Sequence, residues 1–514
     1  MKRDGALESL WQSEVEMYGD GSAGQKTDYD IVITGAGITG VSTAFSLQNK
    51  GFECLIVEAS NIGFGTTGGT TAHLNNFFDA SYDEMIRDFG LEKAKLLAHA
   101  AREALEIISQ NITDYGIECD YSARTGYLFS LDEEQEKILD DLVEGSRQVG
   151  IGMNETDKNP FGIPCTKIVE IPDQAQFHPL KYIKGLLSEY MNSGGMIVEG
   201  CRVTGVEKKE NHLVVSTTKG NIVCNHLVYA THLPPGKNIM HFRNAPYRSY
   251  VLALKLKNNN YPQALGYDLF EPYHYYRSHT IDGEEDLIAG GEDHKTGDIE
   301  NTDECFEKLK DYVDQYFDIE RVAYKWSSQF YEPADGLPYI GHLPGSPENV
   351  YCATGYSGNG MIFGTLAAKT LSDLITTGDS MYKDLFAPSR VKPVAGFSNV
   401  VKEGADVFKH LVFDKFMVER LQTLANLEKD EGKLINYEGS LVAVYKDRNG
   451  INHILESACT HLQCTVKWNR EEKSWDCPCH GSRFGIDGEI LTGPAVKKLK
   501  NVGTPEDSER LDLG

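Results

Sequence analysis

Cysteine and histidine residues gather in two short groups near the C-terminus. The groups are Cys459, His461 and Cys464, then Cys477, Cys479 and His480. Fifteen residues lie between His461 and Cys477. Two thiolates and two imidazoles can hold the two irons of a [2Fe–2S] cluster, which transfers electrons. Structural zinc is the alternative, and the C-x-H and C-x-x-H spacing between short strands favours the cluster.

A second pattern that could bind a cofactor stands near the N-terminus. An apolar run over residues 31–34 leads into Gly35, Gly37 and Gly40, and a helical pattern and a second apolar run then end at Glu58. In such a βαβ unit the glycines allow a tight turn, close approach to a pyrophosphate and helix–strand packing. The helix N-terminus attracts phosphate, and the acid can accept hydrogen bonds from ribose. The pattern predicts a dinucleotide site, against the alternatives of a plain glycine turn and a solvated strand-end acid.

Two further glycine-rich segments favour an extended flavin cofactor. Residues 62–72 form a long Gly/Thr loop that can bring backbone amides against such a cofactor. Residues 350–361 form an apolar run and a glycine-rich turn before an apolar helix over 362–375. The positive end of that helix would suit the reduced flavin edge, which carries negative charge.

The chain up to about residue 390 resembles the D-amino-acid-oxidase-like group of flavin-dependent amine and amino-acid oxidases. The resemblance rests on the first glycine unit, the loop after Glu58, and residues 230–232, 335–341 and 353–361. It implies a bound FAD, with Gly355–Met361 against the flavin ring and Val203 on the adenine side. The expected FAD-binding residues are Gly35, Gly37, Ile38, Thr39, Gly40, Glu58, Thr66, Thr67, Thr70, Thr71, Val203, Gly355, Gly358, Asn359, Gly360 and Met361.

The first loop also bears on how the flavin is attached. Some members of this group tether the flavin through a His or Cys near this loop. Here the loop carries Gly68 and Gly69, and His73 lies further along. We therefore expect non-covalent FAD.

The C-terminal Cys/His groups resemble Rieske iron–sulfur proteins of the respiratory and photosynthetic quinol-oxidising type. The resemblance implies that the cluster ligands are Cys459, His461, Cys477 and His480. It also implies a Cys464–Cys479 disulfide that clamps the two ligand loops, although cytosolic disulfides are uncommon.

Residues beside the cluster motif bear on its reduction potential. Ser482 could hydrogen-bond a cluster sulfur and raise the potential. Phe484 stands where the quinol-oxidising type usually has a tyrosine donor, so we expect a lower potential than in those proteins. Residues 493–495 resemble the proline loop that covers the cluster.

Residues 248–291 alternate between apolar and polar side chains and predict an antiparallel sheet that faces the substrate. The substrate-pocket candidates are Arg248, Tyr267, Tyr275 and Arg277. Arginine and tyrosine would suit a substrate carboxylate. The alternative is that these side chains lie on the faces of the sheet and do not contact a substrate. The sequence identifies no catalytic acid or base.

A chain of 514 residues exceeds the size of one ordinary domain. We predict an N-terminal arm over 1–27 and a flavin domain over 28–390, with substrate-binding parts at about 120–200 and 240–330. A helical linker over 391–430 and a Rieske domain over 431–514 follow. The expected fold is an α/β FAD-binding domain with an antiparallel-sheet substrate domain and a C-terminal all-β domain.

The composition and net charge of the chain argue against several classes of binding partner. A net charge of −26 argues against nucleic acid and anionic membrane surfaces. No apolar run is long enough to span a membrane, and the first residues lack an apolar signal core, so we expect a cytoplasmic protein.

Three functions fit these motifs. In the first, an amine or amino acid reduces FAD, and the [2Fe–2S] cluster passes the electrons to an acceptor that the sequence does not identify. In the second, electrons run from the cluster to the flavin, which reduces or hydroxylates a substrate. In the third, the protein is a non-catalytic redox carrier or sensor.

Overall fold

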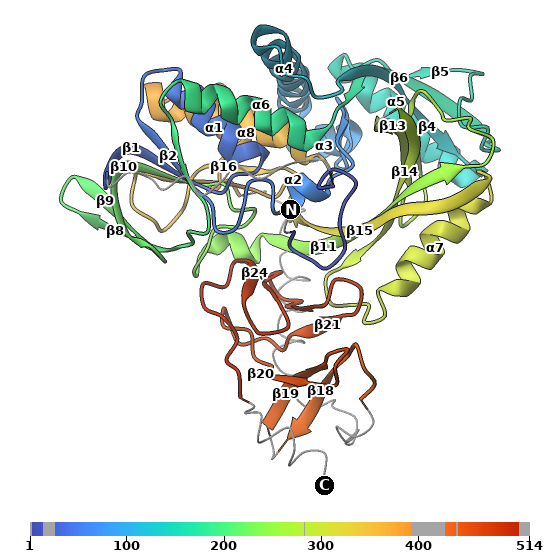
Figure 1. The fold of residues 1–514 in the computed structure, drawn as a ribbon. Helices are drawn as coiled ribbons and strands as arrows, with labels where there is room; N and C mark the ends of the chain where they lie inside the picture. The colour runs from blue at the N-terminus through green and yellow to red at the C-terminus, as the bar shows by residue number, and fades with distance from the viewer. Residues whose placement is uncertain (1–2, 14–25, 282, 392–426, 438–439, 503–514) are drawn as a thin grey trace.

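The computed structural model describes residues 3–13, 26–281, 283–391, 427–437 and 440–502. Most of the predicted helical linker over 391–430 lies outside these residues. The described chain forms a large α/β part, with the C-terminal strands packed beneath it (Figure 1). None of the described helices is long and apolar enough to cross a membrane.

The first sheet is built around parallel strands that read as apolar runs in the sequence, because both of its faces are buried. Its order is β16-β17-β10-β1-β2-β7, with the antiparallel hairpin β8–β9 attached to β10. The strands are β1 (Asp28–Thr34), β2 (Cys54–Val57), β7 (Met196–Val198), β8 (Val203–Lys209), β9 (His212–Thr217), β10 (Gly220–Tyr229), β16 (Tyr339–His342) and β17 (Val350–Thr354).

Helices cover one face of this sheet (Figure 1). Helix α1 (Ile38–Gln48) packs between α8 (Gly360–Thr377) and α6 (Pro179–Asn192). Two further helices, α3 (Tyr82–Phe89) and α4 (Leu91–Tyr115), follow each other in the chain. Gly90, with φ +87°, separates them because a left-handed residue ends a helix.

The second sheet has the order β15-β11-β14-β13-β12-β4-β6-β3, with β5 (Asn154–Glu155) paired to β6. Its strands are β3 (His73–Leu74), β4 (Ser122–Ser130), β6 (Lys167–Gln176), β11 (Asn244–Leu256), β12 (Leu265–Asp268), β13 (Tyr275–Ile281), β14 (Glu284–Lys295) and β15 (Ile319–Pro333). The antiparallel sheet predicted over 248–291 is confirmed, while β12 and β4 pair in parallel. Helices α5 (Glu133–Val149) and α7 (Asp303–Asp314) flank it.

The C-terminal part consists of two small antiparallel sheets, which confirms the predicted all-β region. One contains β18 (Glu431–Tyr437), β19 (Ser440–Lys446) and β20 (Asn452–Glu456). The other contains β21 (Lys467–Asn469), β22 (Ser474–Asp476), β23 (Arg483–Phe484) and β24 (Ile490–Thr492), and it lies next to the large α/β part (Figure 1).

The described N-terminal residues 3–13 pack against both parts of the molecule. Trp11 is fully buried, and its Nε1 donates to Thr70 O at 2.5 Å. The Ala6 N–H donates to Glu472 O at 3.1 Å. The predicted arm thus includes a segment that joins the loop after β2 to the C-terminal part.

Candidate functional site

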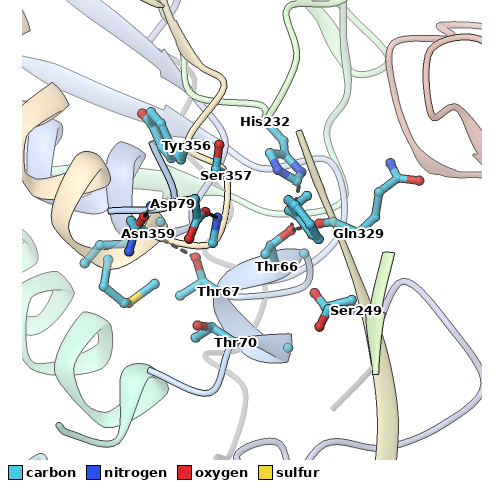
Figure 2. Close-up of a pocket in the computed structure, with 18 of the residues that line it drawn as sticks. Thr66, Thr67, Thr70, Asp79, His232, Ser249, Gln329, Tyr356, Ser357 and Asn359 are labelled. Carbon is cyan, nitrogen blue, oxygen red and sulfur yellow. Dashed lines mark hydrogen bonds between the residues drawn. The ribbon is translucent and has the colours of Figure 1, made fainter. Parts of the chain in front are cut away.

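A cavity of about 680 Å³ lies between the two large sheets. This volume falls within the range of about 300–1,000 Å³ that cofactor and ligand pockets occupy. Its walls come from the turn after β1, the short helix α2 (Thr66–Gly69), the second sheet and the loop before α8. Figure 2 shows side chains from several of these elements converging on it.

The turn after β1 forms one end of the cavity. Gly37 caps helix α1 without a side chain, and the N–H of Ile38 donates to Thr67 Oγ1 at 3.1 Å. The N-cap residue itself covers no further N–H group, so this helix end is suited to phosphate. A Cβ on Gly40 would lie 1.8 Å from Gly35 O, so only glycine allows this helix–strand contact. Glu58 accepts from the N–H groups of Ala36 and Ser60 at 2.8 and 2.7 Å, and burial raises its pKa.

The expected FAD-binding residues lie together, with two exceptions. All of them line the cavity except Gly40 and Gly355. Gly40 packs against the Gly35 carbonyl of the turn. Gly355, with φ +76°, leaves space for Asn244, whose Oδ1 would lie 2.4 Å from a Cβ at that position. The glycine turn and the helix end at this part of the cavity fit an extended dinucleotide such as FAD.

The close contact at Gly40 gives a first testable expectation. Gly40→Ala should weaken FAD binding by about tenfold or more, because the added methyl must displace the Gly35 carbonyl. FAD content after purification, read from absorbance, measures the effect. Gly205→Ala is the control, since a Cβ there meets nothing within 4 Å. Equal FAD content in both variants would contradict the expectation.

The second sheet supplies the opposite wall, and it contains two of the four substrate-pocket candidates. Tyr267 and Tyr275 line the cavity. The Tyr267 hydroxyl donates to Asn75 Oδ1, and the Tyr275 hydroxyl lies 2.8 Å from Ser249 Oγ. Burial raises the pKa of both phenols, so both are neutral hydrogen-bonding groups.

The two arginine candidates lie outside the cavity wall. Arg248 points to the other face of the sheet, where it donates to Ser327 Oγ at 2.8 Å and to Asp476 at 3.4 Å. Arg277 is fully buried and donates to the carbonyl oxygens of Thr71 and Ala72. A substrate carboxylate in the cavity therefore meets neither guanidinium. Sequence alternation could not reveal which face of the sheet turns towards the cavity.

Asp293 and Asp79 are among the acidic cavity residues that the sequence did not predict. Asp293 on β14 and Asp79 in the loop before α3 both line the cavity. Burial raises the pKa of Asp293 to about 7. Desolvation by the surrounding protein also raises the pKa of Asp79, whose side chain is exposed and whose Oδ2 accepts from the Gly358 N–H at 2.6 Å. Neither residue belongs to a recognisable motif, so only the fold reveals them.

The cysteine and histidine ligands expected for the cluster are brought together in the C-terminal part. Cys459 and Cys477 are buried and interact with each other. The rings of His461 and His480 lie 5.0 Å apart. Buried nitrogens on both rings, Nδ1 of His461 and both of His480, have no hydrogen-bond partner among the described residues. Two adjacent thiols and two imidazoles with unused nitrogens fit a [2Fe–2S] cluster.

The remaining pair of cysteines forms a disulfide in this structure, Cys464–Cys479. Their sulfurs also lie within 4.8 Å of a His480 ring nitrogen, a spacing that could hold a metal. A disulfide sulfur is not a thiolate, and thiolates are the form that binds iron. The set of Cys459, His461, Cys477 and His480 is therefore the better ligand set.

Ser482 lies where it can tune the cluster. Its hydroxyl is fully buried, hydrogen-bonds the sulfur of Cys459 and accepts from the Ala495 N–H at 3.0 Å. Ser482→Ala should lower the cluster potential, because a donor to the thiolate stabilises the reduced state. A loss of about 1–2 kcal/mol corresponds to a shift on the order of 40–80 mV for one electron. Redox titration followed by electron paramagnetic resonance checks this, and an unchanged or higher potential would contradict it.

The cluster region and the cavity share a wall. Tyr331 on β15 donates to His480 O at 3.0 Å, and Gln329 on the same strand donates to Gly481 O at 2.9 Å. Thr66 in turn donates to Gln329 O at 2.9 Å, and Figure 2 shows Thr66, His232 and Gln329 side by side. Leu491, Thr492, Gly493, Ala495 and Val496 also line the cavity.

Two family models match the chain. The model described as FAD dependent oxidoreductase matches residues 30–374, and the model described as Rieske [2Fe-2S] domain matches residues 417–503. The two matches cover the cavity and the cysteine–histidine centre respectively.

Some known proteins are similar to this chain over nearly its whole length, and others only over its larger, flavin-binding part. The Bacillus subtilis (strain 168) protein YhfW, whose name describes a Rieske 2Fe-2S iron-sulfur protein, is 33% identical over 97% of this chain and 98% of its own length. Gamma-glutamylputrescine oxidoreductase of Escherichia coli (strain K12) is 26% identical over 70% of this chain and 86% of its own. Glycine oxidase from Geobacillus kaustophilus has the same fold, with a TM-score of 0.60, 17% identity, and coverage of 71% of this chain and 100% of its own.

Proposed function

Because the chain belongs to the family of FAD-dependent oxidoreductases and carries a Rieske [2Fe–2S] domain, we propose that it oxidises an amine or amino acid and that the electrons leave through the cluster of the same chain. The membership confirms the resemblance found in the sequence, and with it FAD and one [2Fe–2S] cluster as cofactors.

The substrate class is supported by relatives of the larger part. One is named for gamma-glutamylputrescine and another for glycine, and both compounds carry an amino group. The amine loses a C–H hydrogen with its electron pair and a proton from nitrogen, and water then hydrolyses the resulting imine to a carbonyl compound and ammonia or a smaller amine. The bound flavin would accept the electron pair, and the cluster would carry single electrons to an external one-electron acceptor.

The observation that carries the electron route is the shared strand β15. Gln329 and Ser328 line the cavity, while Gln329 and Tyr331 hydrogen-bond the backbone at His480 and Gly481. One rigid strand therefore contacts both the flavin cavity and a cluster-ligand loop. Such contact supports transfer within one chain, since no large domain movement is needed to bring the two sites together.

Anaerobic mixing of the purified holoenzyme with candidate amines and amino acids tests the proposal. We expect loss of the oxidised flavin absorbance, followed by the paramagnetic signal of a reduced cluster. Reduction of the flavin with a permanently oxidised cluster would contradict the electron route. A flavin that no amine or amino acid reduces, with a cluster that chemical reductants do reduce, would contradict the substrate class.

A further inference from the structure

Acidic residues greatly outnumber basic ones among the described residues that line the cavity. Seven of its lining residues are Asp or Glu, and Arg202 is the single Lys or Arg among the described residues that line it. Arg202 lies at the Glu58 end, where its guanidinium donates to Ile490 O at 2.9 Å. The wall formed by the second sheet therefore offers no guanidinium or ammonium group to a substrate carboxylate.

Asp293 is turned into the cavity by an irregularity of β14. Arg248 pairs with His294 and Tyr250 pairs with Gly291, so β14 carries one extra residue between these pairs. Glu292 lies in this bulge with φ +57°, a backbone conformation that is energetically unfavourable for a residue other than glycine. Ser249 and Asp293 thereby lie on the cavity face.

The Asp293 carboxylate lacks a counter-charge. Its Oδ1 is buried and has no hydrogen-bond partner among the described residues. His274, whose positive charge acts on Asp293, is itself paired with Asp268 at 2.9 Å and with Glu292 at 3.4 Å. A buried carboxylate oxygen without a partner is costly, so the site is suited to a ligand that supplies a donor or a positive charge.

Asp79 supplies a second carboxylate from the opposite wall. Figure 2 shows it beside Ser357 and Asn359, across from Ser249. The Gly358 N–H holds its Oδ2 in place at 2.6 Å. The rings of Tyr273 and Tyr275, 5.6 Å apart, also line the cavity, and aromatic faces attract cations.

We propose that Asp293 and Asp79 bind the cationic nitrogen of an alkyl amine, so that the substrate class is an amine rather than an α-amino acid. This inference rests on the proposed function and narrows it. The unpartnered Asp293 oxygen, the two carboxylates and the two aromatic rings form the recognition site. The carboxylate of an α-amino acid would meet negative charge there and no cation.

A pair of isosteric probes tests the charge preference directly. Tert-butylammonium and pivalate have the same shape and opposite charge, and tert-butylammonium has no hydrogen on the carbon next to nitrogen, so it cannot be oxidised to an imine. Binding to the oxidised full-length holoenzyme is followed by perturbation of the flavin absorbance and by calorimetry. We expect tert-butylammonium to bind more tightly than pivalate.

Variants then assign the binding to the two residues. Asp293→Asn and Asp79→Asn should each weaken tert-butylammonium binding by about tenfold or more and leave pivalate no weaker. Glu271→Gln is the control. Glu271 also lines the cavity and is exposed like Asp79, but no hydrogen bond among the described residues holds its carboxylate in place, whereas the Gly358 N–H holds that of Asp79. We expect less than about a twofold change from the loss of this solvent-screened charge. An unchanged flavin spectrum and melting temperature show that each variant is folded.

The inference is overturned if pivalate binds the wild type as tightly as tert-butylammonium. It is also overturned if both Asp variants keep wild-type affinity for tert-butylammonium. Neither probe delivers electrons, so such a failure leaves the electron route untouched. A cluster that substrate never reduces would conversely leave the cation site intact.

Discussion

Glu472→Gln is expected to destabilise the folded chain by about 3–5 kcal/mol, the usual cost of breaking a buried ion pair from one side. The Glu472 carboxylate is buried, forms an ion pair with Arg3 and accepts from Ser327 N and Oγ at 3.0 and 2.7 Å. Glutamine keeps the size of the side chain and removes its charge. Thermal unfolding followed by calorimetry measures the loss.

The effect is large because Glu472 belongs to a balanced buried network. Three guanidinium groups face three carboxylates, and the members are Arg3, Arg248, Arg483, Asp4, Glu472 and Asp476. They come from the N-terminal segment, the flavin-binding part and the Rieske domain. Loss of one carboxylate leaves excess positive charge at the place where all three segments meet.

The pH dependence of this loss follows from the pKa of Glu472. Burial alone would raise the pKa, but the guanidinium groups of Arg3, Arg248 and Arg483 outweigh it and hold the pKa at about 2. Since the folded pKa lies below the unfolded value, the stabilisation is present above about pH 4.5 and is lost as the pH falls towards 2. The stability difference between wild type and Glu472→Gln should therefore shrink below about pH 4.5.

Glu456→Gln is the matched control. Glu456 pairs with Lys500 at 3.3 Å on the surface, and such a pair contributes about 0–1 kcal/mol. Equal melting temperatures for the two variants would contradict the role given to the buried network.

Cys477→Ser is expected to abolish the iron–sulfur cluster and leave the flavin in place. The serine hydroxyl does not ionise near neutral pH, whereas the thiolate is the iron ligand. Turnover with a one-electron acceptor should fall at least about 100-fold, since changes even in the surroundings of a metal cost about 10–100-fold in affinity or activity. Anaerobic bleaching of the flavin by substrate should persist.

The readouts are iron content, flavin content and the two rates. Cys165→Ser is the control, since Cys165 is a half-buried free thiol outside the Cys/His groups and should keep its iron. Wild-type turnover by a Cys477→Ser protein that contains no cluster would show that electrons leave the flavin by another route.

Local motifs could be predicted from the sequence, because each is a short run whose residues act together. The Gly35–Gly40 segment leads from β1 into the first turn of α1 as predicted, and the two Cys/His groups converge on one centre. The parallel sheet follows from apolar runs and the second sheet from alternation. These features depend on neighbours in sequence.

The substrate wall could not be predicted, because it depends on which face of a sheet turns inward. Arg248 and Arg277 share the alternating segment with Tyr275, yet the arginines are used for internal contacts. Asp293 faces the cavity because of a β-bulge at Glu292, and no residue type in this segment predicts that bulge. The network around Glu472 joins residues more than 460 positions apart, as the hydrogen bond from Leu7 N illustrates.

The most direct test of the account is rapid anaerobic mixing of the holoenzyme with a reducing amine substrate at several protein concentrations. Transfer from flavin to cluster within one chain predicts that the rate constant for cluster reduction does not change with protein concentration. A rate constant that rises in proportion to protein concentration, or a cluster that stays oxidised while the flavin is bleached, would contradict it.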